Sequence, residues 1–257
     1  MARAPRNANA ACPYAPRELM QTELEARFYD RSRGWVDGTT EFHNLIRSCV
    51  KPNATLLEIG AGPTNPTSEF LSTLGTLTGI DPDADVMTNR FLSHAFTMQG
   101  ERFPLENQAY DLCVSDYVAE HLPDPVTHLR EVYRVLKPGG CYLFRTPNFT
   151  HYVTLISAAT PHWFHKRVAN RARGLPAEAH DPYPVHYLIN SSRRVKALAE
   201  DAGFRIESLR MVEKEPSYGR FAKAAFYAGL VYERLVNRFD QLASFRSNMQ
   251  VVLRKPA

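Results

Sequence analysis

Short apolar segments alternate along this chain with longer segments of mixed polarity. Strand-like apolar runs occur at residues 55–59, 77–80, 95–98, 110–115 and 141–144. Apolar residues at helical spacing predict helices between these runs, at residues 66–74, 84–94 and 125–136. Strands and helices that alternate in this way predict an α/β fold whose doubly wound sheet is mostly parallel.

The last part of the chain shows a different pattern. Residues 204–212 and 249–253 both alternate between apolar and polar positions like strands, so we expect them to form an antiparallel hairpin at one edge of the sheet. Ser191 or Ser192 is expected to cap a helix that ends at Gly203. Further helices are predicted at residues 18–31, 40–50, 152–172 and 220–242.

Composition narrows the class of protein. With 44% hydrophobic and 23% charged residues in 257, the chain is typical of packed globular proteins. The net charge of +4 is mild and no run of like charge stands out, so no nucleic-acid partner is expected. The four cysteines form no CxxC pair, which favours free thiols over a metal site. No secretory signal or apolar run of about 18 residues appears, and we expect a cytoplasmic protein.

The end of the first predicted strand contains the first chemical signal. Gly60-Ala61-Gly62 allows a tight turn and close approach of a ligand to the backbone, although a turn without a ligand uses the same residues. Asp81 ends the next strand, 21 residues after Gly60. A carboxylate at that place can accept hydrogen bonds from both hydroxyls of a ribose. Together the two features predict a nucleoside site; alone, Asp81 would be a turn residue before Pro82.

Four segments together resemble a known family. They are LLEIGAGPTNPTS (56–68), LTGIDPDADV (77–86), RFPLENQAYDLCVS (102–115) and LREVYRVLKPGG (129–140). Their order and spacing resemble the motifs of class I S-adenosylmethionine (SAM)-dependent methyltransferases that act on small molecules. The resemblance is close over residues 54–147. It implies a Rossmann-like fold and SAM as cofactor.

The resemblance also implies roles for individual residues. Glu58 and the turn Gly60, Ala61 and Gly62 would border the amino acid part of SAM, and Asp81 would hold the ribose. The remaining positions implied are Pro82 and Asp83 at the adenine edge, Gln99 or Glu101 at its far side, and Ser115, Asp116 and Tyr117 beneath the sulfonium.

Two positions depart from the family pattern. Thr64, preceded by Pro63, stands where many members carry a third glycine, so the turn is expected to differ in detail. Gln99 stands where many carry an adenine-binding aspartate; its amide oxygen can still accept a hydrogen bond from the adenine amino group. A shift of the local alignment would make Glu101 the contact instead.

Methyl transfer needs a base only when the acceptor must lose a proton. Among the histidines His121, His151, His162, His165 and His186, we prefer His151, which follows the predicted fifth strand. His121 resembles a histidine common in the family after the fourth strand, where it either fixes the loop or contacts the ligands. No metal site is predicted.

The predicted organisation is a disordered tail at 1–17 and a single domain at 18–257. Within that domain, 18–50 forms N-terminal helices, while 145–190 and 214–246 form insertions on the acceptor side. The basic, aromatic-rich stretch 220–239 predicts either core packing or contact with a membrane surface.

The predicted function is methylation of a small molecule, most simply at an oxygen of a lipophilic or carbohydrate-derived compound. The alternatives are an NAD-dependent oxidoreductase and a non-catalytic SAM-fold binding protein. The missing third glycine and the later motifs count against the oxidoreductase, and intact Gly60, Gly62 and Asp81 count against a decayed pocket. The sequence does not indicate an oligomeric state.

Overall fold

A computed structural model describes residues 23–100, 102–159, 183–216 and 222–257. Its centre is a seven-stranded sheet with the order β3-β2-β1-β4-β5-β7-β6. The strands are β1 (Ala54–Ile59), β2 (Gly75–Asp81), β3 (His94–Thr97), β4 (Tyr110–Asp116), β5 (Leu136–Pro147), β6 (Arg205–Val212) and β7 (Asn248–Arg254). The first five are parallel, whereas β7 runs antiparallel to β5 and β6 antiparallel to β7. The predicted mostly parallel sheet with an antiparallel C-terminal edge is confirmed.

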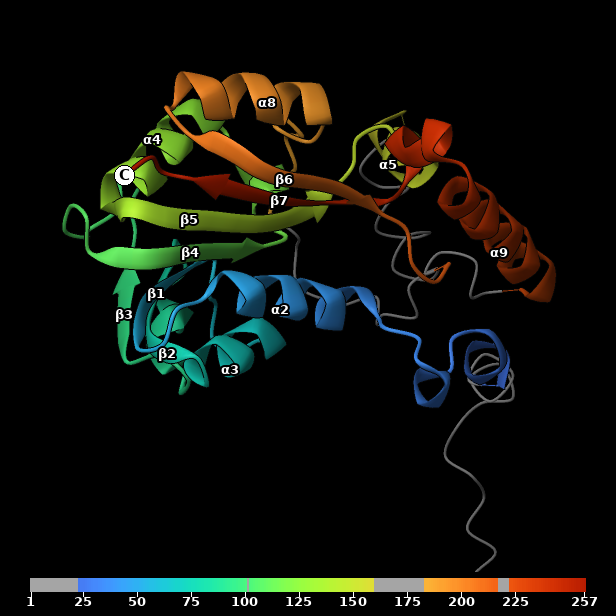
Figure 1. Cartoon of the computed structure of the whole chain (residues 1–257), viewed down its shortest axis with the longest axis horizontal. Helices are drawn as coiled ribbons and strands as arrows, with labels where there is room; N and C mark the ends of the chain where they lie inside the picture. The colour runs from blue at the N-terminus through green and yellow to red at the C-terminus, as the bar shows by residue number, and fades with distance from the viewer. Residues whose placement is uncertain (1–22, 101, 160–182, 217–221) are drawn as a thin grey trace, which may run out of the picture.

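Helices cover both faces of this sheet (Figure 1). One face packs against α2 (Gly38–Cys49) and α3 (Pro66–Ser72), with Phe42, Ile46 and Leu71 in the core. The other packs against α4 (Pro125–Val135) and α8 (Ser192–Asp201). Both faces of the central strands are therefore apolar, which explains why their sequences are nearly continuous apolar runs.

Capping residues set the helix starts where the sequence predicts them. The Asn65 side chain accepts a hydrogen bond from the Ser68 backbone N–H, and Pro66 occupies the first turn of α3. Ser191 caps α8 in the same way, as one of the two predicted caps.

Three predicted boundaries differ from the structure. The helix predicted at 84–94 is wrong, because only the short 3-10 helix η2 (Ala84–Thr88) forms there. Asn89 has extended backbone and directs its side chain to the carbonyls of the glycine turn, which ends the helical conformation. The helix predicted at 66–74 is α3, which ends at Ser72, and Gly75 already belongs to β2. The predicted 220–242 helix is divided into α9 (Lys223–Arg238) and η5 (Asp240–Phe245).

An outer group of elements lies beyond the carboxyl ends of the central strands (Figure 1). It includes helical residues 23–28, η1 (Arg31–Arg33), α5 (Tyr152–Ala159) and α9, while η3 (Ala119–His121) follows β4. Tyr29 packs edge-on against Phe226 of α9, and Tyr152 of α5 packs edge-on against Tyr232. Parts of the predicted N-terminal helices and of the predicted 145–190 insertion thus each contact α9 of the 214–246 insertion. Among the described helices, none has both the length and the apolarity needed to cross a bilayer.

The predicted 1–17 tail, residues 160–172 of the predicted 152–172 helix, and Glu101 lie outside the described residues. So do His162 and His165. The three cysteines that are described, Cys49, Cys113 and Cys141, are free, and no metal-binding group of His, Cys, Asp and Glu occurs in the described part of the chain.

Candidate active site

The glycine turn and Asp81 are joined by a direct hydrogen bond. The Gly62 N–H donates to Asp81 Oδ2 over 3.0 Å, and the Gly60 N–H donates to the Ile80 carbonyl over 2.8 Å. Both contacts follow from the parallel pairing of β1 with β2, which places Ile59 beside Ile80. The glycine turn and Asp81, which lie 21 residues apart in the sequence, are therefore neighbours at one edge of the sheet, as a shared nucleoside requires.

Both glycines of the turn have left-handed backbone, with φ of 77° at Gly60 and 53° at Gly62. A Cβ on Gly60 would lie 2.3 Å from Val118 Cγ2, whereas a Cβ on Gly62 would meet nothing within 4 Å. The backbone at Gly62 therefore faces open space, which leaves room for a ligand. Gly60 instead allows the loop after β4 to approach the turn.

Replacing Gly60 by alanine should disrupt this turn. We expect a loss of stability of about 1–2 kcal/mol from the left-handed conformation, followed by displacement of Val118 and weaker SAM binding in calorimetric titration. Gly34→Ala is the matched control, because Gly34 also has a positive φ, of 87°, but a Cβ there would meet nothing. That variant should lose stability and keep SAM affinity. Equal SAM affinity in both variants would contradict the assignment of the turn.

A buried polar cluster holds the turn from below. Glu58 is 2% exposed and accepts hydrogen bonds from the Ser68 hydroxyl and the Asn65 amide. The Asn89 amide donates to the Ala61 and Gly62 carbonyls and to the Ser68 hydroxyl. Burial raises the pKa of Glu58 to about 7, against the opposing effect of its two hydrogen-bond donors. Glu58 thus supports the glycine turn through its hydrogen bonds with Asn65 and Ser68.

Asp81 is buried and organised on both carboxylate oxygens. Besides the bond from Gly62, its Oδ1 accepts the Asp83 backbone N–H over 2.8 Å. Each carboxylate oxygen has a second lone pair that can accept from a ribose hydroxyl. Asp83 caps η2 and Pro82 is exposed beside it, so both lie at the rim of the crevice.

The end of β3 forms the neighbouring wall. The Met98 N–H donates to the Asp81 carbonyl over 2.9 Å. The exposed Gln99 follows Met98 and therefore lies just beyond the end of β3, the strand that pairs with β2. Gln99 therefore lies at the same edge of the sheet as Asp81. Glu101, the alternative adenine contact, is not among the described residues.

Ser115, near the end of β4, and Tyr117, directly after β4, lie in different environments. Ser115 is fully buried and its hydroxyl pairs with Tyr142, which also contacts His128, so this side chain points into the core. Tyr117 has left-handed backbone, with φ of 58°, and its ring is 40% exposed. Strained non-glycine backbone is common at functional loops.

Asp116 is bound by a buried arginine that the sequence did not identify. Arg145 Nε and Nη2 each donate to one Asp116 oxygen over 2.7 Å, and the Thr67 hydroxyl donates to Oδ2. Burial acts to lower the pKa of Arg145, but the ion pair with Asp116 outweighs this and raises it. Thr67 belongs to α3, so this network connects the helix of the glycine turn to β4 and β5.

The two candidate bases lie in different environments. His121 Nδ1 is 2.9 Å from the Pro184 carbonyl and must donate to it, which leaves Nε2 as the acceptor in the neutral ring. His151 is 4% exposed, its Nε2 has no hydrogen-bond partner, and it lies 3.6 Å from Glu213 Oε2. Burial lowers the pKa of His151 to about 4 and raises that of Glu213 to about 7.

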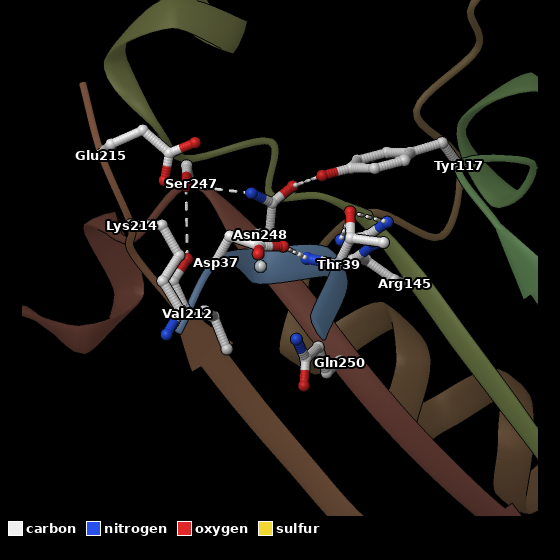
Figure 2. Close-up of a pocket in the computed structure, with 11 residues that line it drawn as sticks. Asp37, Thr39, Tyr117, Arg145, Val212, Lys214, Glu215, Ser247, Asn248 and Gln250 are labelled. Carbon is white, nitrogen blue, oxygen red and sulfur yellow. Dashed lines mark hydrogen bonds between the residues drawn. The ribbon is translucent and has the colours of Figure 1, made fainter. Parts of the chain in front are cut away.

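A cavity opens beside this network, between the N-terminus of α2 and the ends of β5, β6 and β7 (Figure 2). It holds about 570 Å³ of space, part of it open to solvent. Its lining residues are Asp37, Gly38, Thr39, Tyr117, Arg145, Val212, Lys214, Glu215, Ser247, Asn248 and Gln250. Tyr117 and Arg145 connect it to the loop after β4. His151 is not among the lining residues.

Sequence reasoning did not identify Asn89, Thr67 and Gln250 as site residues. Thr67 lies within the 56–68 motif without an assigned role, Asn89 and Gln250 lie outside the four motifs, and only the folded chain brings them to the site. Arg145 carried a weak signal, as a charged residue in an apolar strand.

Comparison with known proteins agrees with this geometry. Residues 57–144 match the family model described as a methyltransferase domain. An uncharacterized methyltransferase of Mycobacterium bovis (strain BCG / Pasteur 1173P2) is 36% identical over 94 residues, which are 34% of this chain and 36% of that protein. Cycloartenol-C-24-methyltransferase 1 of Oryza sativa subsp. japonica is 26% identical over 171 residues, 61% of this chain and 45% of that protein.

A SAM-dependent methyltransferase of Methanosarcina mazei shares the fold, with a TM-score of 0.55 at 15% identity over 82% of this chain and 97% of that one. The chain spans little more than a third of the first curated relatives that it matches. The matched region nevertheless contains the glycine turn, Asp81 and the loop after β4. Residues 57–144 are therefore similar to the methyltransferase domain of these relatives, and the chain has the fold of class I SAM-dependent methyltransferases.

Proposed function

We propose that this chain transfers the methyl group of SAM to an oxygen of a small-molecule acceptor. The observation that carries the proposal is the hydrogen bond from the Gly62 N–H to Asp81, since it brings a backbone-lined turn and a ribose-binding carboxylate to one crevice. The open space in front of Gly62 fits a ligand in that place. Exposed Gln99 and the rim residues Pro82 and Asp83 would border the adenine.

In the transfer, the acceptor oxygen forms a bond to the methyl carbon while the carbon–sulfur bond breaks, its electron pair stays on sulfur, and the hydroxyl proton leaves. SAM supplies an activated leaving group, so the protein contributes mainly alignment and exclusion of water. Tyr117 and Asp116, at the end of β4, lie between the turn and the cavity and would align the two substrates.

We propose that Nε2 of His121, and not His151, accepts the proton that leaves the acceptor hydroxyl. The hydrogen bond to Pro184 defines the tautomer of His121 that leaves Nε2 free to accept. His151 is instead buried against Glu213 and Tyr232, whereas His121 is only partly buried; neither histidine lines the described cavity. We therefore propose that His151 positions α5 against α9.

His121→Gln tests this assignment, because glutamine can still donate to the Pro184 carbonyl but cannot accept a proton. We expect kcat to fall about 100-fold with unchanged SAM affinity, measured by release of S-adenosylhomocysteine. His121→Ala should lose both the base and the loop contact. Recovery of full activity in the glutamine variant would show that His121 only fixes the loop.

The proposed activity is tested by binding and turnover. SAM, and not NADH, should raise the melting temperature of the protein, and S-adenosylhomocysteine should appear when a cell extract supplies acceptors. Stabilisation by NADH alone would favour the oxidoreductase. SAM binding without turnover would favour a non-catalytic SAM-binding protein.

The outer elements would cover the acceptor side without lining the described cavity. Contacts of Tyr29 with Phe226 and of Tyr152 with Tyr232 join the three sequence regions for which no motif was found. Exposed Tyr227, Val231 and Leu235 form a stripe along α9, which keeps contact of 220–239 with a membrane surface as an alternative to acceptor binding. Within this proposal the protein has no nucleic-acid partner and acts in the cytoplasm.

A further inference from the structure

Gln250 is a buried amide whose two polar atoms have no hydrogen-bond partner in the described part of the chain. It lies on β7, is 1% exposed, and both its Nε2 and its Oε1 are unpaired. Buried polar groups are nearly always paired, because burying them unpaired costs free energy. Gln250 also lines the cavity described above, and Figure 2 draws its side chain below the other lining side chains with no dashed line to it.

The strand register places this amide beside the network at Asp116. Gln250 is the direct neighbour of Arg145 across the β5–β7 pair, and Asn248 precedes it on the same face. Asn248 accepts a hydrogen bond from the Tyr117 hydroxyl over 3.1 Å. Val118, which follows Tyr117 in the chain, packs on Gly60 of the glycine turn. Tyr117 and Val118 therefore connect the cavity to the glycine turn.

Three of the four charged side chains that line the cavity have ion-pair partners, and the fourth is the carboxylate of Glu215. Arg145 pairs with Asp116, Lys214 with Glu41 at 2.8 Å, and Asp37 with Arg31 at 2.9 Å. An anionic ligand would have to displace one of these carboxylates, so the cavity favours a neutral ligand. An apolar ligand would leave the Gln250 amide unpaired.

We propose that the cavity is the acceptor site, that Gln250 binds the acceptor, and that the acceptor is a neutral, hydroxyl-rich small molecule of the sugar or cyclitol type. Each hydroxyl both donates and accepts, so neighbouring hydroxyls satisfy Nε2 and Oε1 of one amide together. The half-exposed Tyr117 ring offers an apolar surface for the C–H groups of such a ring. The inference rests on the proposed methyltransferase activity and names its substrate class.

The test uses the full chain and Gln250→Leu, with Gln241→Leu as control, since Gln241 is an exposed glutamine of η5 outside the cavity. A panel of methyl glycosides and inositols is compared with a panel of cholesterol and hydroquinone, with release of S-adenosylhomocysteine as the readout. We expect turnover of a member of the first panel, with kcat/KM lowered about 100-fold in Gln250→Leu and unchanged in Gln241→Leu.

Two further measurements separate the possible failures. SAM affinity should be equal in all three proteins; failure of the unaltered chain to bind SAM would overturn the proposed function itself. The melting temperature of Gln250→Leu should equal or exceed that of the unaltered chain, because leucine removes an unpaired buried amide. A lower melting temperature would make Gln250 a structural residue and overturn the inference. Turnover confined to cholesterol or hydroquinone, or SAM binding with no member of the first panel converted, would also overturn it.

Discussion

Asp81→Ala should weaken SAM binding by at least about 100-fold, because two charge-assisted hydrogen bonds to the ribose are lost, each worth about 1.5–3 kcal/mol. The effect has a second cause in this structure. Asp81 also accepts the backbone N–H groups of Gly62 and Asp83, so its removal loosens both sides of the crevice. Calorimetric titration with SAM measures the change directly.

Asp81→Asn separates the two causes. The asparagine keeps one oxygen acceptor for the backbone and removes the charge, so we expect an intermediate loss of affinity. Asp85→Ala serves as the control, since Asp85 is an exposed carboxylate of η2 on the same segment. Unchanged SAM affinity in Asp81→Ala would remove Asp81 from the site and with it the shared crevice.

Arg145→Met should lower the free energy of unfolding by about 3–5 kcal/mol, the usual loss when one partner of a buried ion pair is removed. The Arg145 and Asp116 side chains are 6% and 15% exposed, so Asp116 would remain charged and poorly solvated. The guanidinium also lies over the rings of Phe42 and Tyr117, which packs α2 and the loop after β4 against the sheet. Urea denaturation gives the free energy, and acceptor turnover should fall with it.

Arg130→Met is the matched control. Its ion pair with Asp201 has partners that are 61% and 57% exposed, and such surface pairs contribute at most about 1 kcal/mol. The double variant Arg145→Met with Asp116→Asn should recover part of the lost stability, since no unpaired charge remains. Equal destabilisation by Arg145→Met and Arg130→Met would show that burial gives the first pair no special importance.

Local rules account for the elements that the sequence predicted well. The central strands are buried on both faces, so apolar runs mark them, and the caps Asn65 and Ser191 act within one turn of their helices. The helix predicted at 84–94 failed because a tertiary contact competes there. Asn89 bonds to Ala61 and Gly62, 28 and 27 residues earlier, and no local pattern records that contact.

The candidate site divides in the same way. Gly60, Gly62 and Asp81 were predictable, since each follows its own strand and parallel neighbouring strands end at one edge of the sheet. Ser115 stands in the motif but points into the core against Tyr142. Our preferred base, His151, follows the expected strand, yet its ring lies against Glu213 from a distant part of the chain.

The sequence by itself thus determined the α/β class, the strands, the glycine turn and the position of Asp81, because periodicity, caps and glycine turns act between residues close in the chain. Only the tertiary structure decided that Arg145 binds Asp116, that His121 Nδ1 is hydrogen-bonded to the Pro184 carbonyl, and that the buried Gln250 amide has no partner among the described residues. These properties depend on burial and pairing between strands far apart in sequence. The residue types alone do not specify them.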